Sequence, residues 1–176
     1  MKTIWLGTGQ DYTQVLDLQE KLWQEALDKP DSFSPVLLLL EHSPVYTIGR
    51  TRDQSSLGQK TDLPYPVVEI NRGGQATYHG PGQLVGYPIV NLEFTGRNLH
   101  GFVHGLELCL IAACAEYGIQ ARQREGLVGI WVEDRKLASI GVGVRKWISM
   151  HGFAINIAKE SVIPFHNITP CGLPNV

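Results

Sequence analysis

Two long stretches with helical periodicity, set among many short stretches of strand type, limit what this chain can fold into. Apolar residues recur every three or four positions over Tyr12–Asp28 and again from Phe102 to Tyr117. Asn98 is placed to cap the second helix and Gly118 to end it. Short apolar or alternating runs between turn residues predict strands over 2–6, 36–42, 45–48, 67–71, 83–92, 127–132, 136–144 and 149–157.

The expected hairpin turns outnumber the helices that could serve as crossovers, which argues against a purely parallel sheet. We therefore expect an α/β or α+β fold with a mixed, mostly antiparallel sheet and flanking helices. A length of 176 residues is that of one domain, long enough to bury a substantial core.

Composition and charge exclude several classes of protein. Hydrophobic residues make up 43% of the chain and charged residues 18%, as in an ordinary globular protein, and the longest apolar run, Val36–Leu40, is too short to cross a bilayer. The first residues contain no signal-peptide pattern, so we expect a soluble, cytoplasmic protein. A net charge of −2 without a polybasic tract predicts neither a nucleic-acid partner nor a membrane partner.

The positive charges are nevertheless unevenly distributed. Between positions 120 and 150 there are three acidic residues but six basic ones. The basic residues are Arg122, Arg124, Arg135, Lys136, Arg145 and Lys146. They are either solvated strand ends or a docking face for an acidic protein. Both interpretations stay open at this point.

The three cysteines have different sequence surroundings. Cys109 and Cys114 lie within the second helical pattern, and we expect both to pack as small hydrophobic residues. Cys171 lies in a Pro-Cys-Gly turn, outside any periodic pattern. Since thiolate chemistry needs a partly exposed thiol near a positive charge, Cys171 is either a nucleophile or an inert loop thiol.

The segment from Arg72 to Gln83 is the richest in glycine. Residues 72–82 hold four glycines and one proline beside Thr77, Tyr78 and His79. Such a loop lets the backbone approach a ligand closely, although a simple tight hairpin would also use glycine. Lys136, at the start of an expected strand, is on its own most easily explained as a solvated edge residue.

Other chemistries have incomplete motifs. Residues 57–61 lack the Gly-Lys pair of a phosphate-binding loop, and Gly141 and Gly143 lack the third glycine of a dinucleotide site. His100 and His104 share a helix face, but the glutamate of the zinc motif and a third ligand are missing, so no metal is expected.

Five segments together carry a resemblance to a known family. They are Glu41-His42-x-Pro44-Val45-Tyr46-Thr47-x-Gly49, Arg72-Gly73-Gly-x-x-Thr77-Tyr78-His79-Gly-Pro-Gly82-Gln83, Gly129-x-Trp131-Val132 before Lys136-x-x-Ser139-x-Gly141, His151-Gly152-Phe153-Ala154-x-Asn156, and Thr169-Pro170-Cys171-Gly172. In this order they resemble the lipoyl(octanoyl) transferase family, the lipoate-protein ligase B group. The match runs over nearly the whole chain.

The resemblance implies the catalytic-domain fold of biotin and lipoate protein ligases. It also implies an acyltransferase without a cofactor, which moves an octanoyl group from acyl carrier protein through a cysteine thioester onto a lysine. The implied acceptors are the lipoyl domains of 2-oxoacid dehydrogenase complexes and the H protein of glycine cleavage. This transfer would be the first step of endogenous protein lipoylation.

Residue by residue, the resemblance implies a nucleophile at Cys171 with Lys136 as its partner. It implies a substrate site lined by Arg72, Gly73, Gly74, Gln75, Ala76, Thr77, Tyr78, His79, Ser139, Ile140, Gly141, Gly152, Phe153 and Ala154.

Elementary chemistry agrees with the two catalytic roles. A neighbouring ammonium group favours the reactive thiolate, and once the thiol is acylated the ammonium loses this anion and gives up its proton more readily. Lys136 could then serve as the base for the incoming amine. We also expect backbone N–H groups around Gly141 and Gly172 to stabilise the developing oxyanion.

Three further points follow from the sequence. The chain stops at Val176, whereas family members usually continue, so residues 1–176 are expected to be one catalytic domain, either shortened or lacking that segment. An ATP-dependent lipoate or biotin ligase of the same fold is the second interpretation, although a ligase needs no cysteine nucleophile. A non-catalytic protein that binds an acylated or acidic partner is the third.

Overall fold

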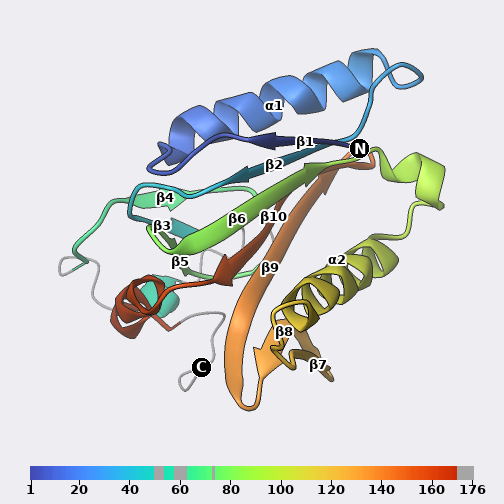
Figure 1. Cartoon of the computed structure of the whole chain (residues 1–176). Coiled ribbons are helices and arrows are strands. Elements are labelled where there is room, and N and C mark those ends of the chain that lie inside the picture. The colour runs from blue at the N-terminus through green and yellow to red at the C-terminus, as the bar shows by residue number, and fades with distance from the viewer. Residues whose placement is uncertain (50–53, 58–62, 73, 170–176) are drawn as a thin grey trace.

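Two β-sheets form the centre of the computed structural model, which describes residues 1–49, 54–57, 63–72 and 74–169 (Figure 1). The larger sheet has seven strands in the order β1 (Lys2–Trp5), β2 (Val36–Leu40), β6 (Gln83–Ile89), β10 (Ile148–Asn156), β9 (Arg135–Arg145), β8 (Leu127–Val132) and β7 (Arg122–Arg124). The smaller sheet has the order β4 (Val67–Glu69), β3 (Val45–Ile48) and β5 (Thr77–His79).

Most strand pairs are antiparallel, and this confirms the mixed sheet expected from the turns. The parallel pairs are β1 with β2 and β3 with β4. Strand β10 lies between β6 and β9, so it joins the first half of the chain to the second. Short 3-10 helices complete the structure: η1 (Gln54–Leu57), η3 (Leu92–Thr95), η4 (Lys159–Ser161) and η5 (Ile163–Asn167).

Helix α1 (Tyr12–Asp28) has the predicted bounds and covers one face of the larger sheet (Figure 1). The Asp11 side chain caps the helix by accepting the N–H of Gln14 at 2.9 Å. Its buried residues are Tyr12, Val15, Gln19, Trp23 and Ala26. Val15 packs with Leu38 and Val85 in the core beneath the helix.

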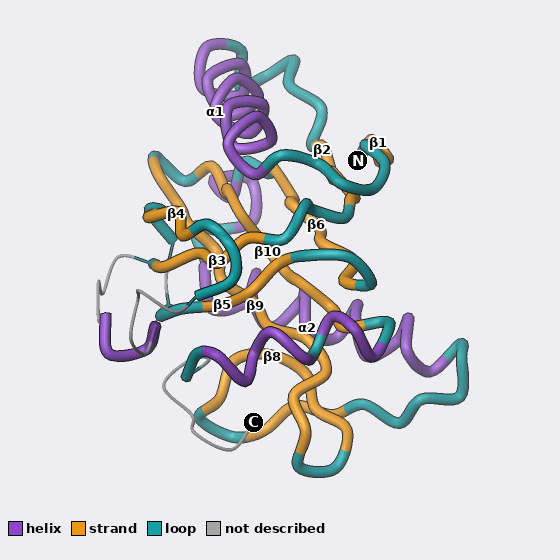
Figure 2. Tube along the Cα trace, turned by 90° about the vertical axis from the view of Figure 1, so that its left-hand side faces the viewer, coloured by secondary structure: helices purple, strands orange, loops and turns teal. Residues whose placement is uncertain are grey.

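Helix α2 (Leu99–Ala115) packs near β8 and β9, and the sheet separates it from α1 (Figure 2). Asn98 caps it as predicted, but its buried residues are Glu107, Leu110 and Cys114. Ala113 and Tyr117 belong to the apolar pattern that predicted this helix and should therefore pack, but both are exposed. Cys109, expected to pack as a small hydrophobic residue, is exposed as well, so these three predictions are wrong. The burial of Cys114 is confirmed.

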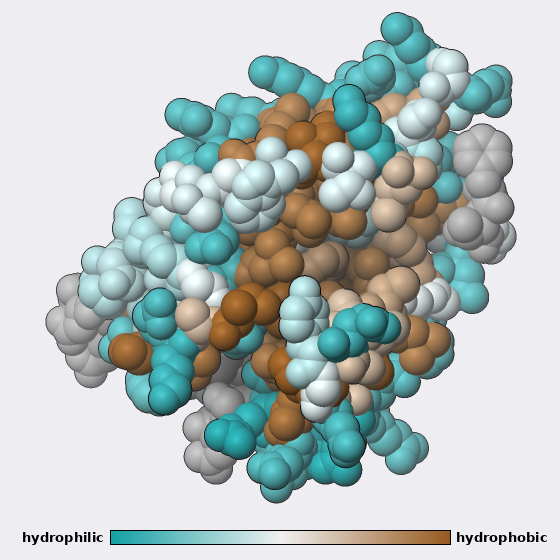
Figure 3. Space-filling model, in the orientation of Figure 1, coloured by the Kyte–Doolittle hydropathy of each residue, from teal (hydrophilic) through white to brown (hydrophobic). Residues whose placement is uncertain are grey.

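Apolar residues gather across the middle of the face drawn in Figure 3. On the sheet face that carries α2, Leu84, Ile140 and Phe153 are partly buried against Leu110 and Cys114. Within the described residues, no helix is long and apolar enough to cross a membrane.

Strands β5 and β7 were not predicted from the sequence. Both have three residues, and β5 lies inside the glycine-rich segment, where no alternation is visible. Tertiary pairing creates β5, because Tyr78 aligns with Tyr46 of β3. A strand this short has no independent stability, so only its partner reveals it.

The alternation along β2 makes a testable prediction about stability. Leu38 is fully buried in the core under α1, whereas Leu39 points to the other face and is half-buried. Leu38→Ala should lower the free energy of unfolding by about 3 kcal/mol, because it removes buried methyl groups and leaves a cavity. Leu39→Ala, the matched control, should cost less than half as much in urea denaturation. Equal losses would contradict the assigned strand faces.

Candidate functional site

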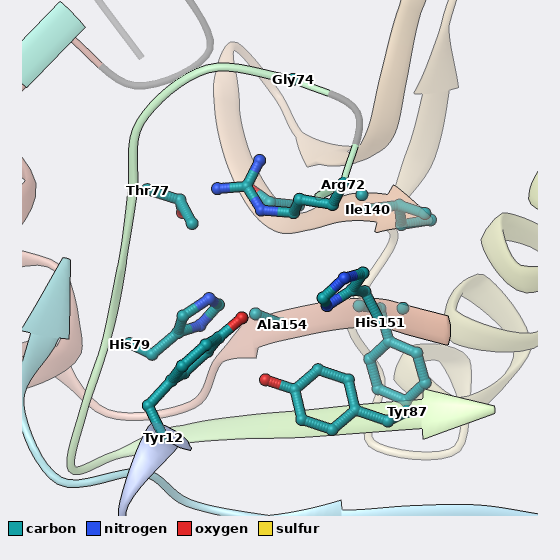
Figure 4. Close-up of a pocket in the computed structure, with 13 residues that line it drawn as sticks. Tyr12, Arg72, Gly74, Thr77, His79, Tyr87, Ile140, His151 and Ala154 are labelled. Carbon is teal, nitrogen blue, oxygen red and sulfur yellow. The ribbon is translucent and has the colours of Figure 1, made fainter. Parts of the chain in front are cut away.

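A narrow cavity of about 50 Å³ lies between the larger sheet, the start of α1 and the loop before β5 (Figure 4). Segments far apart in the sequence contribute to its wall. The lining residues are Tyr12, Arg72, Gly74, Thr77, His79, Tyr87, Ser139, Ile140, Gly141, His151, Gly152, Phe153 and Ala154.

Ten of the fourteen residues expected at a substrate site line this cavity, and strand alternation explains why Ala76 and Tyr78 do not. Thr77 and His79 point into the cavity, whereas Ala76 and Tyr78 are buried in an aromatic cluster with Tyr46. Gln75 is half-buried outside the lining. Gly73 lies outside the described residues.

Glycine lets the loop before β5 lie directly on the end of β3. A Cβ atom built on Gly49 would lie 2.2 Å from the Gly74 carbonyl oxygen and 2.9 Å from that of Arg72. No other residue type could accept such a contact without moving the backbone. Gly49, quoted above among the weaker motif residues, therefore fixes the height of this loop over the sheet.

Arg72 is buried in the cavity wall. Its Nη2 donates to the Thr47 hydroxyl at 2.9 Å and to the Thr47 carbonyl oxygen at 3.3 Å. The guanidinium is always charged at physiological pH. It therefore places a fixed positive charge beside His79 and helps to lower the pKa of that imidazole.

A chain of hydrogen bonds lies beneath the cavity. His42 Nδ1 is 3.0 Å from the Gln10 carbonyl oxygen, which cannot donate, so Nδ1 carries the proton. Burial lowers the pKa of His42 to about 4, so the imidazole is neutral and its Nε2 accepts the Tyr87 hydroxyl proton at 2.8 Å. The hydroxyls of Tyr87 and Tyr12 point toward each other in Figure 4.

His79 also has a defined tautomer, because one of its ring nitrogens faces an oxygen that can only accept a hydrogen bond. Its Nδ1 donates to Gln83 Oε1 at 2.8 Å, and the Gln83 amide donates to Asn156 Oδ1 at 2.9 Å. Burial is the main cause that lowers the pKa of His79 to about 3, so the ring is neutral and its Nε2 is an acceptor. Gln83 and Asn156, two residues of the quoted motifs, thus hold this ring in place.

Tyr12, Tyr87 and His151 also line the cavity but were not predicted as site residues. His151 has a left-handed backbone with φ of 59°, and its N–H is held by Gln19 Oε1 at 2.8 Å. A non-glycine residue in this region is strained and often lies at a functional site. The buried face of α1 could have suggested Tyr12, since it is the first residue of that pattern.

A second, wider hollow of about 550 Å³ adjoins the first, and Ser139 lines both. Lys136 at the start of β9 lines it, together with Asn156 from the end of β10. Helix η5 contributes Phe165 and His166. The volume of this hollow is within the range of ordinary ligand pockets.

Lys136 is half-buried rather than a solvated edge residue. Its ammonium lies 5.4 Å from the centre of the buried Trp131 ring, and the Arg124 guanidinium lies 4.8 Å from the same ring. Cations are attracted to the face of an indole at such distances. Trp131 therefore supports the lysine side chain at the mouth of the hollow.

The basic residues at positions 120–150 do not form one face. Strand β9 has 11 residues, so its ends are about 30 Å apart, with Lys136 at one end and Arg145 at the other. Arg124 also pairs with Asp134 at 2.7 Å, and Arg135 lies 3.6 Å from Glu133. A docking face for an acidic protein therefore stays a prediction. Among these six basic residues, Arg135 and Lys136 line the wider hollow.

Cys171 and Gly172 lie outside the described residues, and their proposed roles stay predictions. The last described residue before them is Thr169, whose N–H is held by the Ser56 carbonyl oxygen at 2.8 Å. Gly141, the other predicted oxyanion residue, pairs with Gly152 in the sheet.

Residues 11–172 match the lipoyl protein ligase A/B catalytic domain family. The octanoyltransferase of Geobacter sulfurreducens is 50% identical over 163 residues, which are 93% of this chain and 67% of that protein. The octanoyltransferase of Geobacter metallireducens is 49% identical over 164 residues, covering 93% and 74% respectively. The chain therefore belongs to the lipoyl protein ligase A/B catalytic domain family, and the curated relatives' names confirm the predicted acyltransferase class.

Solved structures of lower identity share the fold. Plasmodium falciparum LipL1 in complex with lipoate has a TM-score of 0.70 at 19% identity, covering 98% of this chain and 54% of that one. A lipoate-protein ligase A bound with ATP has a TM-score of 0.68 at 14% identity, covering 95% and 70%. The predicted fold class is confirmed.

The two buried neutral histidines predict a pH dependence of stability. Folded values of about 4 for the His42 pKa and about 3 for the His79 pKa lie below the ordinary 6.5, so unfolding takes up protons in acid. The stabilisation is complete above about pH 6.5 and is lost as the pH falls toward the folded values, by up to about 1.4 kcal/mol per pH unit for each histidine.

His42→Gln should therefore reduce the number of protons taken up on unfolding by about one between pH 6.5 and 5. The free energy of unfolding of the variant should accordingly depend less steeply on pH. Urea denaturation of both proteins at several pH values gives the two slopes, whatever the variant's stability at pH 7. Identical slopes would show that His42 titrates normally in the folded protein.

Proposed function

We propose that this chain transfers an octanoyl group from acyl carrier protein to Cys171, and from Cys171 to a lysine of a lipoyl domain. The observation that carries the proposal is the junction of the two hollows at Ser139, with Lys136 on one side and the cavity under Arg72 on the other. The octanoyl group is inferred from the two Geobacter relatives, which are octanoyltransferases.

The narrow cavity suits an alkyl tail. Ile140, Phe153 and Ala154 are among the lining residues and bring apolar atoms to the wall. The cavity crosses the sheet from β9 to β6, two strand spacings or about 10 Å. An extended eight-carbon chain spans about 9 Å at ordinary bond lengths. The length of the tail thus matches the distance across the sheet, with its carbonyl near Ser139.

The first half-reaction exchanges one thioester for another. The Cys171 thiolate attacks the octanoyl carbonyl carbon, and the bond from that carbon to the carrier's sulfur breaks. The carrier's thiol leaves after it takes up a proton. An ammonium group at Lys136 would favour the attacking thiolate, because opposite charges stabilise each other outside bulk water.

The second half-reaction forms an amide. The amine of the acceptor lysine attacks the octanoyl carbonyl, a proton passes from this nitrogen to Lys136, and the carbon–sulfur bond to Cys171 breaks. Proton transfer by a positioned side chain contributes about 100- to 10,000-fold in typical enzymes. Nothing in this sequence of steps requires ATP.

We further propose lipoyl domains of 2-oxoacid dehydrogenase complexes and the glycine cleavage H protein as acceptors. The mouth of the wider hollow supports this choice, because basic Lys159 and apolar Ile157 and Val162 are exposed there. Such a mixed surface suits an acidic domain that presents one lysine.

Intact-protein mass spectrometry tests the thioester. After mixing with octanoyl-acyl carrier protein, the native chain should carry one octanoyl adduct that hydroxylamine removes and an apo lipoyl domain accepts. Cys171→Ser should carry none. Cys109→Ser, which removes an exposed thiol on α2, is the matched control and should behave like the native chain.

An adduct that persists in Cys171→Ser would refute the assigned nucleophile. No adduct in the native chain, with lipoyl-domain modification appearing only when ATP and free octanoate are added, would replace the transferase by a ligase.

Lys136→Met should lower the rate of transfer from octanoyl-Cys171 to the lipoyl domain by at least about 100-fold, because it removes the base but keeps the side-chain length. Lys146→Met, an exposed lysine in the turn between β9 and β10 and outside the lining of both hollows, is the control and should match the native rate. Single-turnover assays with preformed adduct give both rates. Equal effects would assign Lys136 to surface charge only.

A further inference from the structure

Helix α2 carries a buried carboxylate that the proposed chemistry does not use. Glu107 is 7% exposed and lies beside the apolar Leu110 and Cys114 on the packed face of α2. Burial of a carboxylate is costly unless hydrogen bonds satisfy it. Two donors do so: the Gly129 N–H reaches Oε1 at 2.8 Å, and the Gln123 amide donates to Oε2.

Gly129 links this carboxylate to the lysine. Its φ of 124° is open only to glycine, and a Cβ atom there would lie 2.7 Å from Lys136 Cε and 2.4 Å from the Ala138 carbonyl oxygen. The backbone of Gly129 therefore lies against the end of the Lys136 side chain. Any rotation of the Gly129 peptide would alter the space in which the ammonium sits.

The pairing of β8 with β9 is irregular at the same place. Trp131 aligns with Lys136, but Ile130 aligns with Ala138, so Leu137 is an extra residue in β9. Such a β-bulge bends the strand and changes the direction of neighbouring side chains. Lys136 directly precedes the bulge, and Gly129 lies just beyond it on the partner strand.

We propose that Glu107 is a positioning residue for Lys136. Its carboxylate holds the Gly129 peptide in the left-handed conformation, this peptide preserves the bulge, and the bulge aims the lysine into the wider hollow. Glu107 thus acts from α2 through the backbone of β8 and touches neither substrate nor nucleophile. The inference rests on the proposed function, because it gives the base of that reaction its position.

A double-mutant cycle tests this chain of contacts. Glu107→Met removes the acceptor but keeps an unbranched side chain of similar length. It should lower the single-turnover rate of octanoyl transfer to the lipoyl domain by roughly 10- to 100-fold, since a displacement of about 1 Å can cost 100-fold. Added to Lys136→Met, the same change should have almost no further effect, because both act through one amine.

Two variants provide the comparison. Glu107→Gln retains an oxygen acceptor for the Gly129 N–H and should keep at least about a third of the native rate. Glu116→Met, at an exposed position after the end of α2, should match the native chain. If Glu107→Met does not fold, Gln123→Leu removes the other hydrogen bond from the same carboxylate and enters the same cycle.

The outcomes separate the possible failures. If Glu107→Met is equally damaging with and without Lys136, Glu107 supports the fold in general and the inference is wrong. If Glu107→Gln is as slow as Glu107→Met, the negative charge rather than the hydrogen bond matters, which also overturns it. Failure of the native chain to form the Cys171 adduct would instead refute the proposed function, whatever the Glu107 variants do.

Discussion

The close contact between the loop carrying Arg72 and the end of β3 determines the shape of the whole site. Gly49 has no side chain, so the carbonyl groups of Arg72 and Gly74 can rest on it. Thr47 of β3, two residues before Gly49, binds the Arg72 guanidinium. The small sheet therefore positions both the loop and its charge over the larger sheet, and the cavity exists because the two sheets stay at this distance.

Much of the fold follows from periodicity along the chain. The bounds of α1 and of β8 match their predicted ranges, because the apolar residues that each element buries form one uninterrupted pattern in the sequence. Helix α2 was predicted in place and Leu110 is buried as expected, but Ala113 and Tyr117 are exposed. The helix is apolar on nearly every side, so its sequence does not indicate which side packs. Strand β5 was missed for a related reason: its partner β3 creates it.

The site was only partly predictable, and the reason lies in strand order. Motif residues such as Thr77, Ser139 and Gly152 come together because β10 pairs with both β6 and β9, an arrangement that spacing along the chain does not reveal. Tyr12 and Tyr87 lie outside the quoted motifs, so they were missed. Alternation within 76–79 is a sequence signal that could have separated the pocket residues of this segment from its core residues.

Glu107 shows a different limit of sequence analysis. A lone acid within an apolar helix is usually assigned to the solvent side, and neither Gly129 nor Lys136 lies near it in the sequence. Only the packing of α2 on β8 brings its carboxylate to the backbone N–H of Gly129. Polar residues with backbone partners are thus difficult to recognise without the fold.

The position of the wider hollow has a consequence for how the two protein substrates share the enzyme. In the described part of the chain, α1 and the buried rings of Tyr12, His42 and Tyr87 close the inner end of the narrow cavity. In the proposed reaction, donor and acceptor would both approach through the Lys136 side. Two folded domains cannot bind at the mouth of the same hollow together, so each would compete with the other for the free enzyme. An excess of either protein would then slow the turnover of both.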